Sequence, residues 1–223
     1  MHRILKKAGP LLRLLHTQYL KKPRPYRYGG IRVVVNPGVF FPRFIFSTRI
    51  MLDYLNGLEL SGKNVLDLGA GCGILGLLAA SKGARVVATD ISPLATENIR
   101  QNAARSHLTL DIIRSDLFES IPRQPFDWIL VTPPYYPKDP VDFPEMAWYC
   151  GKEFGYFVRL FPQLKEFISP GTEIRMILSE DCNFGRIRDI AAGSGWEMTP
   201  VLEKKSWGER NFIYRITLRS GSS

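Results

Sequence analysis

The chain has 223 residues, of which 45% are apolar, and this is enough to fill the core of one large domain. Its three cysteines and three histidines show no CxxC, HxxH or HExxH spacing. This argues against a disulfide framework, a histidine metal site and a Ser-His-Asp hydrolase. The cysteine usage is typical of a reduced intracellular protein, and we expect a cytoplasmic location by default.

The formal net charge of +9 is unevenly distributed along the chain. Residues 1–52 contain eleven Lys or Arg and no acidic residue, whereas the remainder carries 19 basic against 21 acidic residues. We therefore divide the chain into a basic N-terminal extension with a lead-in, residues 1–52, and a second unit, residues 53–220. The basic extension could contact nucleic acid or an anionic membrane surface, or it could be a solvated arm.

The extension begins with a predicted helix. Residues 4–20 space Leu and Ile as a short helix, and the segment from Lys22 to Pro25 ends it because proline lacks an N–H. Arg13 interrupts the apolar stretch, which is too short for a membrane span or a secretory signal. A docked helix and an organellar transit peptide are both compatible with this segment.

The lead-in continues with an extended segment, and residues 31–35 are predicted to form a strand. Residues 36–38 read Asn-Pro-Gly and predict a turn. Ser47 is the expected N-cap of a helix that continues through Asn56.

From Lys63 onward, apolar strands alternate with amphipathic helices. The predicted strands are 64–68, 84–89, 109–114 and 126–132, and the predicted helices are 74–82 and 93–105. This alternation indicates a parallel sheet that helices cover. The strands are nearly continuous apolar runs, as expected where both faces of a sheet are buried.

The C-terminal part changes character after a Pro-rich loop from Pro133 to Pro144. A helix is expected over 153–168, a strand over 172–179 and a helix over 184–193, followed by strands 196–205 and 210–219. The last two strands predict an antiparallel hairpin at the edge of the sheet. The fold class is therefore α/β and Rossmann-like, with a mostly parallel seven-stranded sheet.

The clearest chemical motif is Asp67-Leu-Gly69-Ala-Gly71-Cys-Gly73, between a buried strand and a helix. The glycines let the backbone turn sharply and approach a ligand, and the next helix offers unpaired N–H groups. Asp67 can engage a cationic amino group of a ligand, directly or through water, whereas it would repel a pyrophosphate.

The same stretch formally contains a dinucleotide fingerprint, with glycines at 71, 73 and 76 and Asp90 downstream. This match alone is a weak signal for nicotinamide or flavin binding. The charge of Asp67 and the loop that follows the fourth strand argue against it.

Two further carboxylates follow predicted strands. Asp90 ends the second strand and can accept hydrogen bonds from both hydroxyls of a ribose, since Ser92 is available to cap the next helix. Asp116 follows the third strand and could accept from an adenine amine, with Leu117 or Phe118 lining the ring. The alternative for Asp116 is a turn residue.

The fourth strand leads into Thr132-Pro133-Pro134-Tyr135, in the crevice where parallel sheets bind ligands. The prolines fix the backbone so that a carbonyl can point at an acceptor nitrogen, and the aromatic ring can stack on a planar amide or base. The alternative is a rigid surface turn. Tyr136 is a weaker candidate for the same stacking role.

Together these motifs resemble the class I S-adenosylmethionine (SAM) methyltransferases whose fourth motif reads Asn/Asp-Pro-Pro-Tyr/Phe. The resemblance covers about residues 31–216 and is of HemK-like, or methyltransferase-small, type, with the lead-in Pro37–Thr48 and the segment Trp148–Gly151 matching compact relatives. It implies that SAM is the cofactor and that residues 53–220 are the methyltransferase domain. It implies SAM binding by Thr48, Asp67, Gly69, Ala70, Gly71, Gly73, Asp90, Ile91, Asp116, Leu117 and Thr132, and catalysis by Thr132, Pro133, Pro134 and Tyr135.

One residue departs from the pattern, because Thr132 stands where the family has Asn or Asp. The family residue accepts a hydrogen bond from the acceptor NH₂ group. A threonine hydroxyl can also accept one bond, but its side chain is shorter. The departure leaves room for an acceptor of different size or nucleophilicity.

Several acceptors remain open. The first hypothesis is a planar nitrogen of a protein side chain, of the glutamine-N5 type, in a ribosomal or translation-related protein. The second is an RNA or DNA base, at N6 of adenine or N2 of guanine, favoured by the basic extension and by stacking on a flipped base. A small-molecule acceptor and a catalytically silent SAM-binding module are the remaining alternatives.

Overall fold

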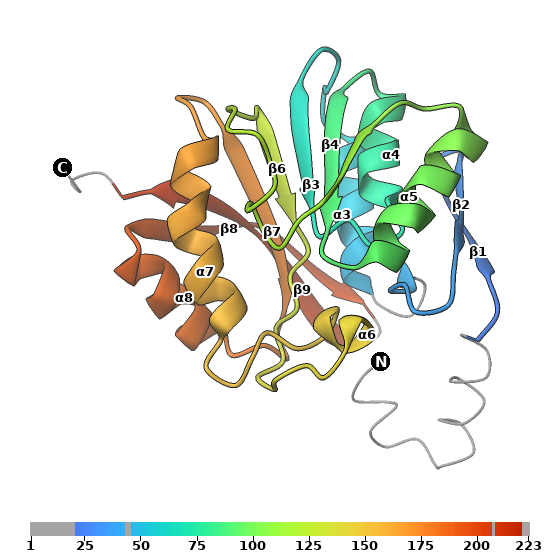
Figure 1. Cartoon of the computed structure of the whole chain (residues 1–223). Coiled ribbons are helices and arrows are strands. Elements are labelled where there is room, and N and C mark those ends of the chain that lie inside the picture. Colours follow the sequence, from blue (N-terminus) through green and yellow to red (C-terminus); the bar gives the residue numbers. More distant parts are fainter. Residues whose placement is uncertain (1–20, 43–45, 207, 220–223) are drawn as a thin grey trace.

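The computed structural model describes residues 21–42, 46–206 and 208–219. The helix expected over residues 4–20 lies outside these ranges. Within them, a seven-stranded sheet forms the centre of the molecule (Figure 1). Its strands are β3 (Asn64–Leu68), β4 (Arg85–Asp90), β5 (Asp111–Arg114), β6 (Trp128–Val131), β7 (Glu173–Ser179), β8 (Trp196–Ser206) and β9 (Glu209–Leu218).

The strand order is β5-β4-β3-β6-β7-β9-β8. Strands β3 to β7 pair in parallel, whereas β9 runs antiparallel to both β7 and β8. This arrangement confirms the predicted fold class. The chain runs from β3 outward to β5 and then returns to place β6 on the other side of β3. Such a reversal opens a crevice at the carboxyl ends of the strands, where ligands bind in sheets of this kind.

Helices cover both faces of the sheet (Figure 1). Residues of α3 (Phe46–Asn56), α4 (Ile74–Ser81) and α5 (Pro93–Ser106) join the apolar cluster on one face. Residues of α7 (Gly155–Leu164), of the 3₁₀ turn Lys165–Phe167 and of α8 (Phe184–Gly193) join the cluster on the other face. The α7 helix and its 3₁₀ turn fall within the helix expected over 153–168.

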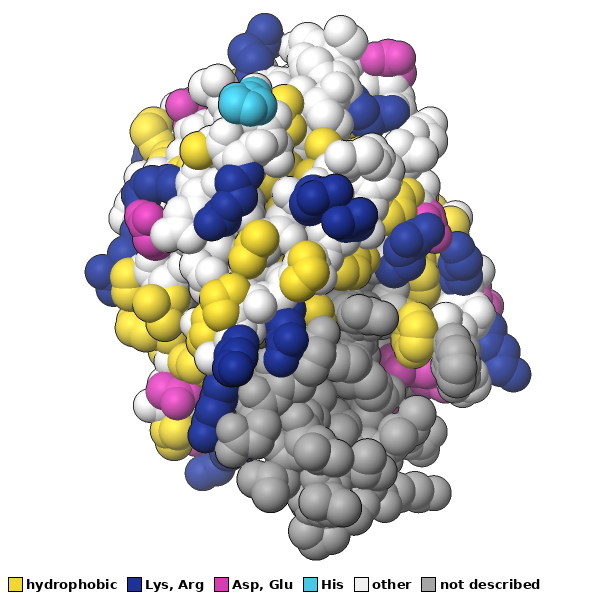
Figure 2. Space-filling model, turned by 90° about the vertical axis from the view of Figure 1, so that its right-hand side faces the viewer, with side chains coloured by type: hydrophobic (Ala, Val, Ile, Leu, Met, Phe, Trp, Pro, Cys, Tyr) yellow, Lys and Arg dark blue, Asp and Glu magenta, His cyan; other side chains and the backbone are white. Residues whose placement is uncertain are grey.

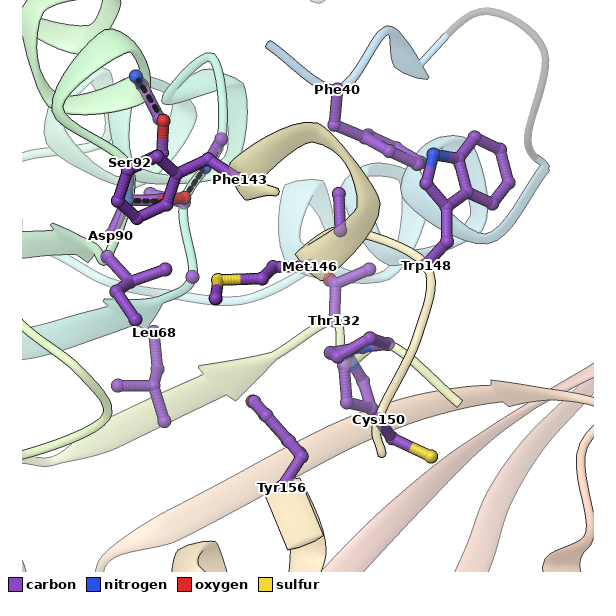
Figure 3. Close-up of a pocket in the computed structure, with 18 of the residues that line it drawn as sticks. Phe40, Leu68, Asp90, Ser92, Thr132, Phe143, Met146, Trp148, Cys150 and Tyr156 are labelled. Atoms are coloured by element: carbon purple, nitrogen blue, oxygen red, sulfur yellow. Dashed lines mark hydrogen bonds between the residues drawn. The ribbon is translucent and has the colours of Figure 1, made fainter. Parts of the chain in front are cut away.

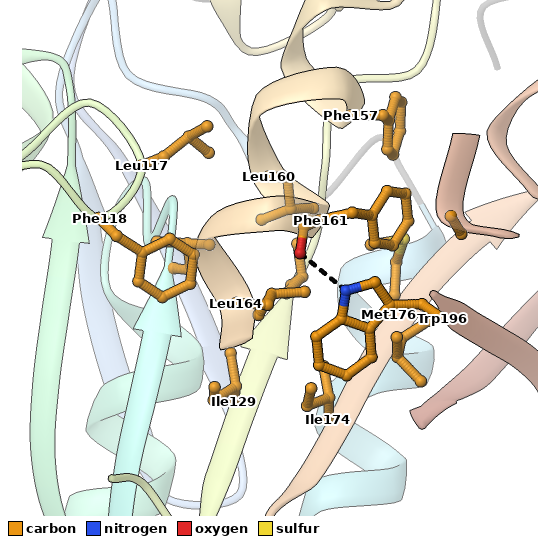
Figure 4. Close-up of a cluster of buried hydrophobic side chains, with 14 of the residues drawn as sticks. Leu117, Phe118, Ile129, Phe157, Leu160, Phe161, Leu164, Ile174, Met176 and Trp196 are labelled. Atoms are coloured by element: carbon orange, nitrogen blue, oxygen red, sulfur yellow. Dashed lines mark hydrogen bonds between the residues drawn. The ribbon is translucent and has the colours of Figure 1, made fainter. Parts of the chain in front are cut away.

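The cluster under α7 is centred on aromatic side chains (Figure 4). Trp196 is 1% exposed, and its indole N–H donates to the Phe161 carbonyl at 2.7 Å. This bond satisfies the polar atom of an otherwise apolar side chain and fixes α7 against the hairpin edge of the sheet. The hairpin strands therefore contribute to the core and are not a separate appendage.

A two-stranded antiparallel hairpin precedes the main sheet. It consists of β1 (Arg24–Tyr28) and β2 (Ile31–Val35), of which only β2 was predicted as a strand. The hairpin is fastened to α5, because Val34 N–H donates to Asn102 Oδ1 at 2.9 Å and Asn98 Nδ2 donates to the Val34 carbonyl at 2.9 Å. The described part of the basic extension thus packs directly on the core.

Two other features of the structure correct the sequence analysis. Helix α3 already begins at Phe46, so Ser47 lies inside the helix and its predicted role as N-cap was wrong. The Pro-rich loop contains a short helix, α6 (Phe143–Met146), whose N-cap is Asp142, with its carboxylate accepting from Glu145 N–H at 2.9 Å. The pattern Asp142-Phe-Pro-Glu145 is a helix-start signal that could have revealed α6.

Candidate active site

A cavity of about 380 Å³ opens at the carboxyl ends of the parallel strands. Its wall contains the loops that follow β3, β4, β5 and β6, the start of α3, and the segment from α6 to α7. Figure 3 shows Leu68 and Asp90 at one end, Thr132, Trp148 and Cys150 at the other, and Met146 between them. The structure therefore brings together two groups of residues that lie about 40 to 80 positions apart in the chain.

The glycine-rich loop forms the cavity wall through Gly69, Ala70 and Gly71. Gly69 has a φ of 75°, and a Cβ built on it would meet no atom within 4 Å, so the loop leaves open space beside its backbone. Gly71 N–H donates to Asp90 Oδ2 at 2.9 Å, which ties the loop to the end of β4. This arrangement lets backbone groups of the loop approach a ligand.

Gly73 is not among the residues that line the cavity. It precedes α4 with a φ of 81°, and a Cβ at this position would lie 3.0 Å from Ile99 Cγ2. The glycine is thus required for close packing of α4 against α5. Its expected direct contact with a ligand is not supported by the geometry.

Asp67 also lies behind the loop and not on the cavity wall. The side chain is 2% exposed, and Gly76 N–H of α4 donates to its Oδ2 at 2.8 Å. Burial raises the pKa of this carboxyl to about 7. The structure therefore places Asp67 as an anchor for the first turn of α4. A direct contact with the ligand would need a rearrangement of the loop, and the alternative contact through water stays a prediction.

Asp90 lies on the cavity wall next to Ile91 and Ser92. Its two carboxylate oxygens accept from Gly71 N–H and from Ser92 N–H, both at 2.9 Å, and each oxygen keeps further lone-pair capacity. Burial raises its pKa, while these backbone donors lower it. Ser92 accepts from Ala95 N–H and caps α5, so the carboxylate is left to face the cavity, as the sequence suggested.

Asp116 and Leu117 line the same end of the cavity. Arg159 of α7 donates two hydrogen bonds to the Asp116 carboxylate, at 2.7 and 3.0 Å, which fixes its orientation. Leu117 has a φ of 50° and, although it belongs to the apolar cluster under α7, it also contributes to the cavity wall. Phe118, the alternative ring-lining residue, instead lies in the core and stacks on Phe167 with centroids 4.5 Å apart, so that alternative was wrong.

The four residues of the Thr132–Tyr135 loop all line the opposite end. Thr132 Oγ1 is buried and has no hydrogen-bond partner among the residues that the structure describes. The rings of Tyr135 and Tyr136 lie 4.8 Å apart, and burial raises the pKa of both phenols. An unpaired hydroxyl and a fixed aromatic pair are suited to holding a planar polar group.

Several cavity residues were not identified from the sequence. They come from α6, its C-cap and α7, and they are Phe143, Met146, Ala147, Tyr156 and Arg159. Phe40 also lines the cavity, and its ring lies 5.3 Å from the ring of Trp148. Thr48, which was predicted, lies on the wall beside Ser47. No short motif marks the new residues, because their positions depend on how the loop after β6 folds back.

The cavity fits SAM in its distribution of polar groups. It offers a carboxylate pair, Asp90 and Asp116, at one end and apolar or aromatic walls over most of its surface. The Thr89 hydroxyl, next to Asp90 in the chain, is buried on the cavity wall without a partner among the described residues, so the cofactor could supply one, whereas the Thr132 hydroxyl lies at the opposite end. The described residues contain no group of three or more His, Cys, Asp or Glu side chains that could hold a metal ion.

Comparisons with known proteins agree with this geometry. A family model described as methyltransferase small domain matches residues 30–144. Ribosomal protein L11 methyltransferase of Azotobacter vinelandii is 31% identical over 80% of the chain and 55% of its own length. Putative protein N5-glutamine methyltransferase MJ0928 of Methanocaldococcus jannaschii is 34% identical over 48% of the chain and 53% of its own length. The chain thus spans about half the length of these curated relatives.

A solved structure shares the fold. The Thermus thermophilus 16S rRNA N2 G1207 methyltransferase, in complex with AdoMet and guanosine, has a TM-score of 0.58 and 19% identity. The match covers 87% of this chain and 50% of the other. Within the described residues, no helix is long and apolar enough to cross a membrane.

Proposed function

The chain belongs to the methyltransferase small domain family, and on this premise we propose that it methylates a planar nitrogen of a protein side chain. Family and fold identify a SAM-dependent methyltransferase domain. The observation that carries the proposal is the placement of the Thr132–Tyr135 loop at the end of the cavity opposite Asp90. Two relatives whose names specify a protein substrate support the choice of acceptor.

The cofactor end of the cavity would bind SAM through the residues described above. Asp90 would accept hydrogen bonds from the ribose, and Asp116, oriented by Arg159, would face the adenine amine next to Leu117. The backbone of Gly69 to Gly71 would pass close to the ligand. SAM supplies a methyl group on a positively charged sulfur that a nitrogen lone pair can attack.

The acceptor end would position the nitrogen. The Thr132 hydroxyl and the Pro133 carbonyl would accept hydrogen bonds from the acceptor N–H groups and so help to localise the nitrogen lone pair, while the Tyr135 ring would stack on the planar group. Trp148 and Met146 would exclude water from the reacting centre. Positioning and desolvation would supply most of the rate enhancement, and no strong general base would be needed.

The acceptor role of Thr132 is tested by Thr132→Val, which keeps the shape of the side chain but removes the unpaired hydroxyl. Because the hydroxyl is buried without a partner among the described residues, we expect stability to stay the same or rise by about 1 kcal/mol. SAM binding should be unchanged, whereas kcat/KM should fall about tenfold. An unchanged kcat/KM would show that the Thr132 hydroxyl does not bind the acceptor.

The class of acceptor is tested with labelled SAM. Ribosomal proteins and ribosomal RNA are offered separately, and the labelled product is treated with protease or nuclease. A protein acceptor is supported if protease releases the label from the product of the wild-type enzyme and if the Thr132→Val variant transfers less label. Label found only in RNA would replace the protein acceptor with the base-methylating alternative.

That alternative has a structural observation in its favour. Among the charged side chains on the face that carries β1, β2 and α5, Lys and Arg are more frequent than Asp and Glu (Figure 2). Exposed members of this group are Lys22, Arg27, Arg32 and Arg100. If RNA binds there, its affinity should fall steeply with salt, because each phosphate contact releases a counterion.

A further inference from the structure

A second cavity, of about 310 Å³, adjoins the first. Lys22 and Arg24 at the start of the β1–β2 hairpin line it, together with Asn36, Phe41 and Pro144. Gly38, Val39, Phe40 and Trp148 belong to the walls of both cavities. The two spaces are thus neighbours that share a common wall.

The shared wall reaches the acceptor end through Trp148, whereas Phe40 also lies next to Gly71 of the glycine-rich loop. The Phe40 and Trp148 rings are 5.3 Å apart at an interplanar angle of 56°, and they form the aromatic part of this wall. Figure 3 shows Trp148 on the same side of the main cavity as Thr132 and Cys150, away from Asp90. A group in the second cavity would therefore be separated from the acceptor end by the Trp148 ring.

The charged residues that line the second cavity are cationic. Two of its lining residues are cationic, and no acidic residue is among the described residues that line it. Lys22 is exposed, so its ammonium group can reach an incoming carboxylate. The remaining walls are apolar or aromatic, apart from Asn36, and would receive the hydrocarbon part of a side chain.

The surroundings of Tyr136 carry the opposite charge. Asp181 and Glu209 both contribute to raising the pKa of the Tyr136 phenol, so these carboxylates lie near that ring of the main cavity wall. A polynucleotide carries a phosphate on every residue and would meet both charges. A peptide can place one acidic side chain near Lys22 and leave neutral or basic residues near Asp181 and Glu209.

We propose that the second cavity binds an acidic side chain of the protein substrate that flanks the methylated residue. The carboxylate pairs with Lys22, and the stem of the side chain packs on Phe40 and Phe41. This inference rests on the proposed protein acceptor and adds a sequence preference to it. Because Lys22 is exposed at the rim, the ion pair contributes modestly, and we expect a preference of about two- to fivefold.

Nine-residue peptide pools test the preference. Each pool has Gln, or in a second series Lys, at its centre, and one flanking position is fixed as Glu, Ala or Lys while the others are varied. Methyl transfer from tritiated SAM is measured. At one flanking position, the Glu pool should be methylated about two to five times faster than the Ala pool. The Lys22→Glu variant should methylate the pool with Lys at that flanking position fastest.

Lys21→Glu is the matched control, because Lys21 is exposed and adjacent but does not line the cavity. It should keep the wild-type preference, and all variants should bind SAM equally in calorimetry. Equal rates for the Glu and Ala pools at every position would overturn the inference but leave the protein acceptor intact. An equal change of the peptide preference in Lys22→Glu and Lys21→Glu would have the same meaning. Methylation of ribosomal RNA with no labelled peptide or ribosomal protein would overturn the protein acceptor and the inference with it.

Discussion

The two ends of the cavity are built in different ways. At the cofactor end, Gly71 and Asp90 are 19 positions apart, and they follow neighbouring parallel strands that pair directly. At the acceptor end, Phe40, Thr132 and Trp148 come from the lead-in, the end of β6 and the segment after α6. The first end is therefore specified by short motifs, whereas the second depends on how distant segments pack.

The largest expected effect comes from the cofactor end. Asp90→Ala should weaken SAM binding about 100-fold, because it removes the ribose acceptor and frees the N–H groups of Gly71 and Ser92 that hold the loop. Isothermal titration measures the loss. Asp111→Ala, an exposed acid at the start of β5, should bind SAM like the wild type.

The Thr132→Val variant provides the contrast, since a change at the acceptor end should leave the SAM affinity intact. If Asp90→Ala keeps the wild-type SAM affinity, the ribose site lies elsewhere. If Thr132→Val loses that affinity, the two ends are not separate in function.

A pair of glycine substitutions separates binding from packing within the same loop. Gly73→Ala should lower the free energy of unfolding by about 2–3 kcal/mol, because its Cβ would be strained at positive φ and would crowd Ile99. Gly69→Ala should cost about 1 kcal/mol, since its Cβ meets no atom, but it should weaken SAM binding because this residue lines the cavity.

Gly62→Ala is the control for strain alone, because its φ is 71° and its Cβ would meet nothing within 4 Å. Urea unfolding and SAM titration of all three variants give the comparison. Equal losses of stability for Gly62→Ala and Gly73→Ala would show that the contact with Ile99 is not limiting.

The smallest effect concerns Asp67 and pH. The pKa of its carboxyl is about 7 in the folded chain and near 3.8 when unfolded, so between these values the folded state holds a proton that the unfolded state has lost. Stability therefore falls as pH rises from about 4 to 7. Asp67→Asn cannot ionise, and it should gain about 1–2 kcal/mol relative to the wild type between pH 5 and 7.5.

Urea unfolding of the wild type and Asp67→Asn at pH 5 and pH 7.5 tests this sign. The wild type at pH 5, with Asp67 largely protonated, is the internal reference. A difference between the two proteins that does not grow with pH would show that Asp67 is already ionised in the folded state. SAM titration of the same variant asks whether the anchor of α4 also contacts the ligand.

The sequence was sufficient for the sheet, because runs such as residues 64–68 and 126–132 are mostly apolar, as expected of strands that are buried on both faces. It was less informative where polar and apolar residues mix. The strand β1 contains Pro25 and two arginines, and its alternation is limited to Tyr26 and Tyr28, which is too short a pattern to predict the pairing with β2. Helix α6 has only four residues, and its cap was the one available signal.

Sequence by itself determined which residues can turn, ionise or stack: the glycines at 69, 71 and 73, the acids at 67, 90 and 116, and the aromatic ring at 135. Tertiary structure decided which of them face the cavity. Three candidate residues do not face it. Asp67 and Gly73 are held in the packing of α4 and α5, and Phe118 stacks on Phe167 in the core. The reason is physical: a motif fixes local backbone geometry, whereas exposure to a cavity depends on segments that arrive from elsewhere in the chain.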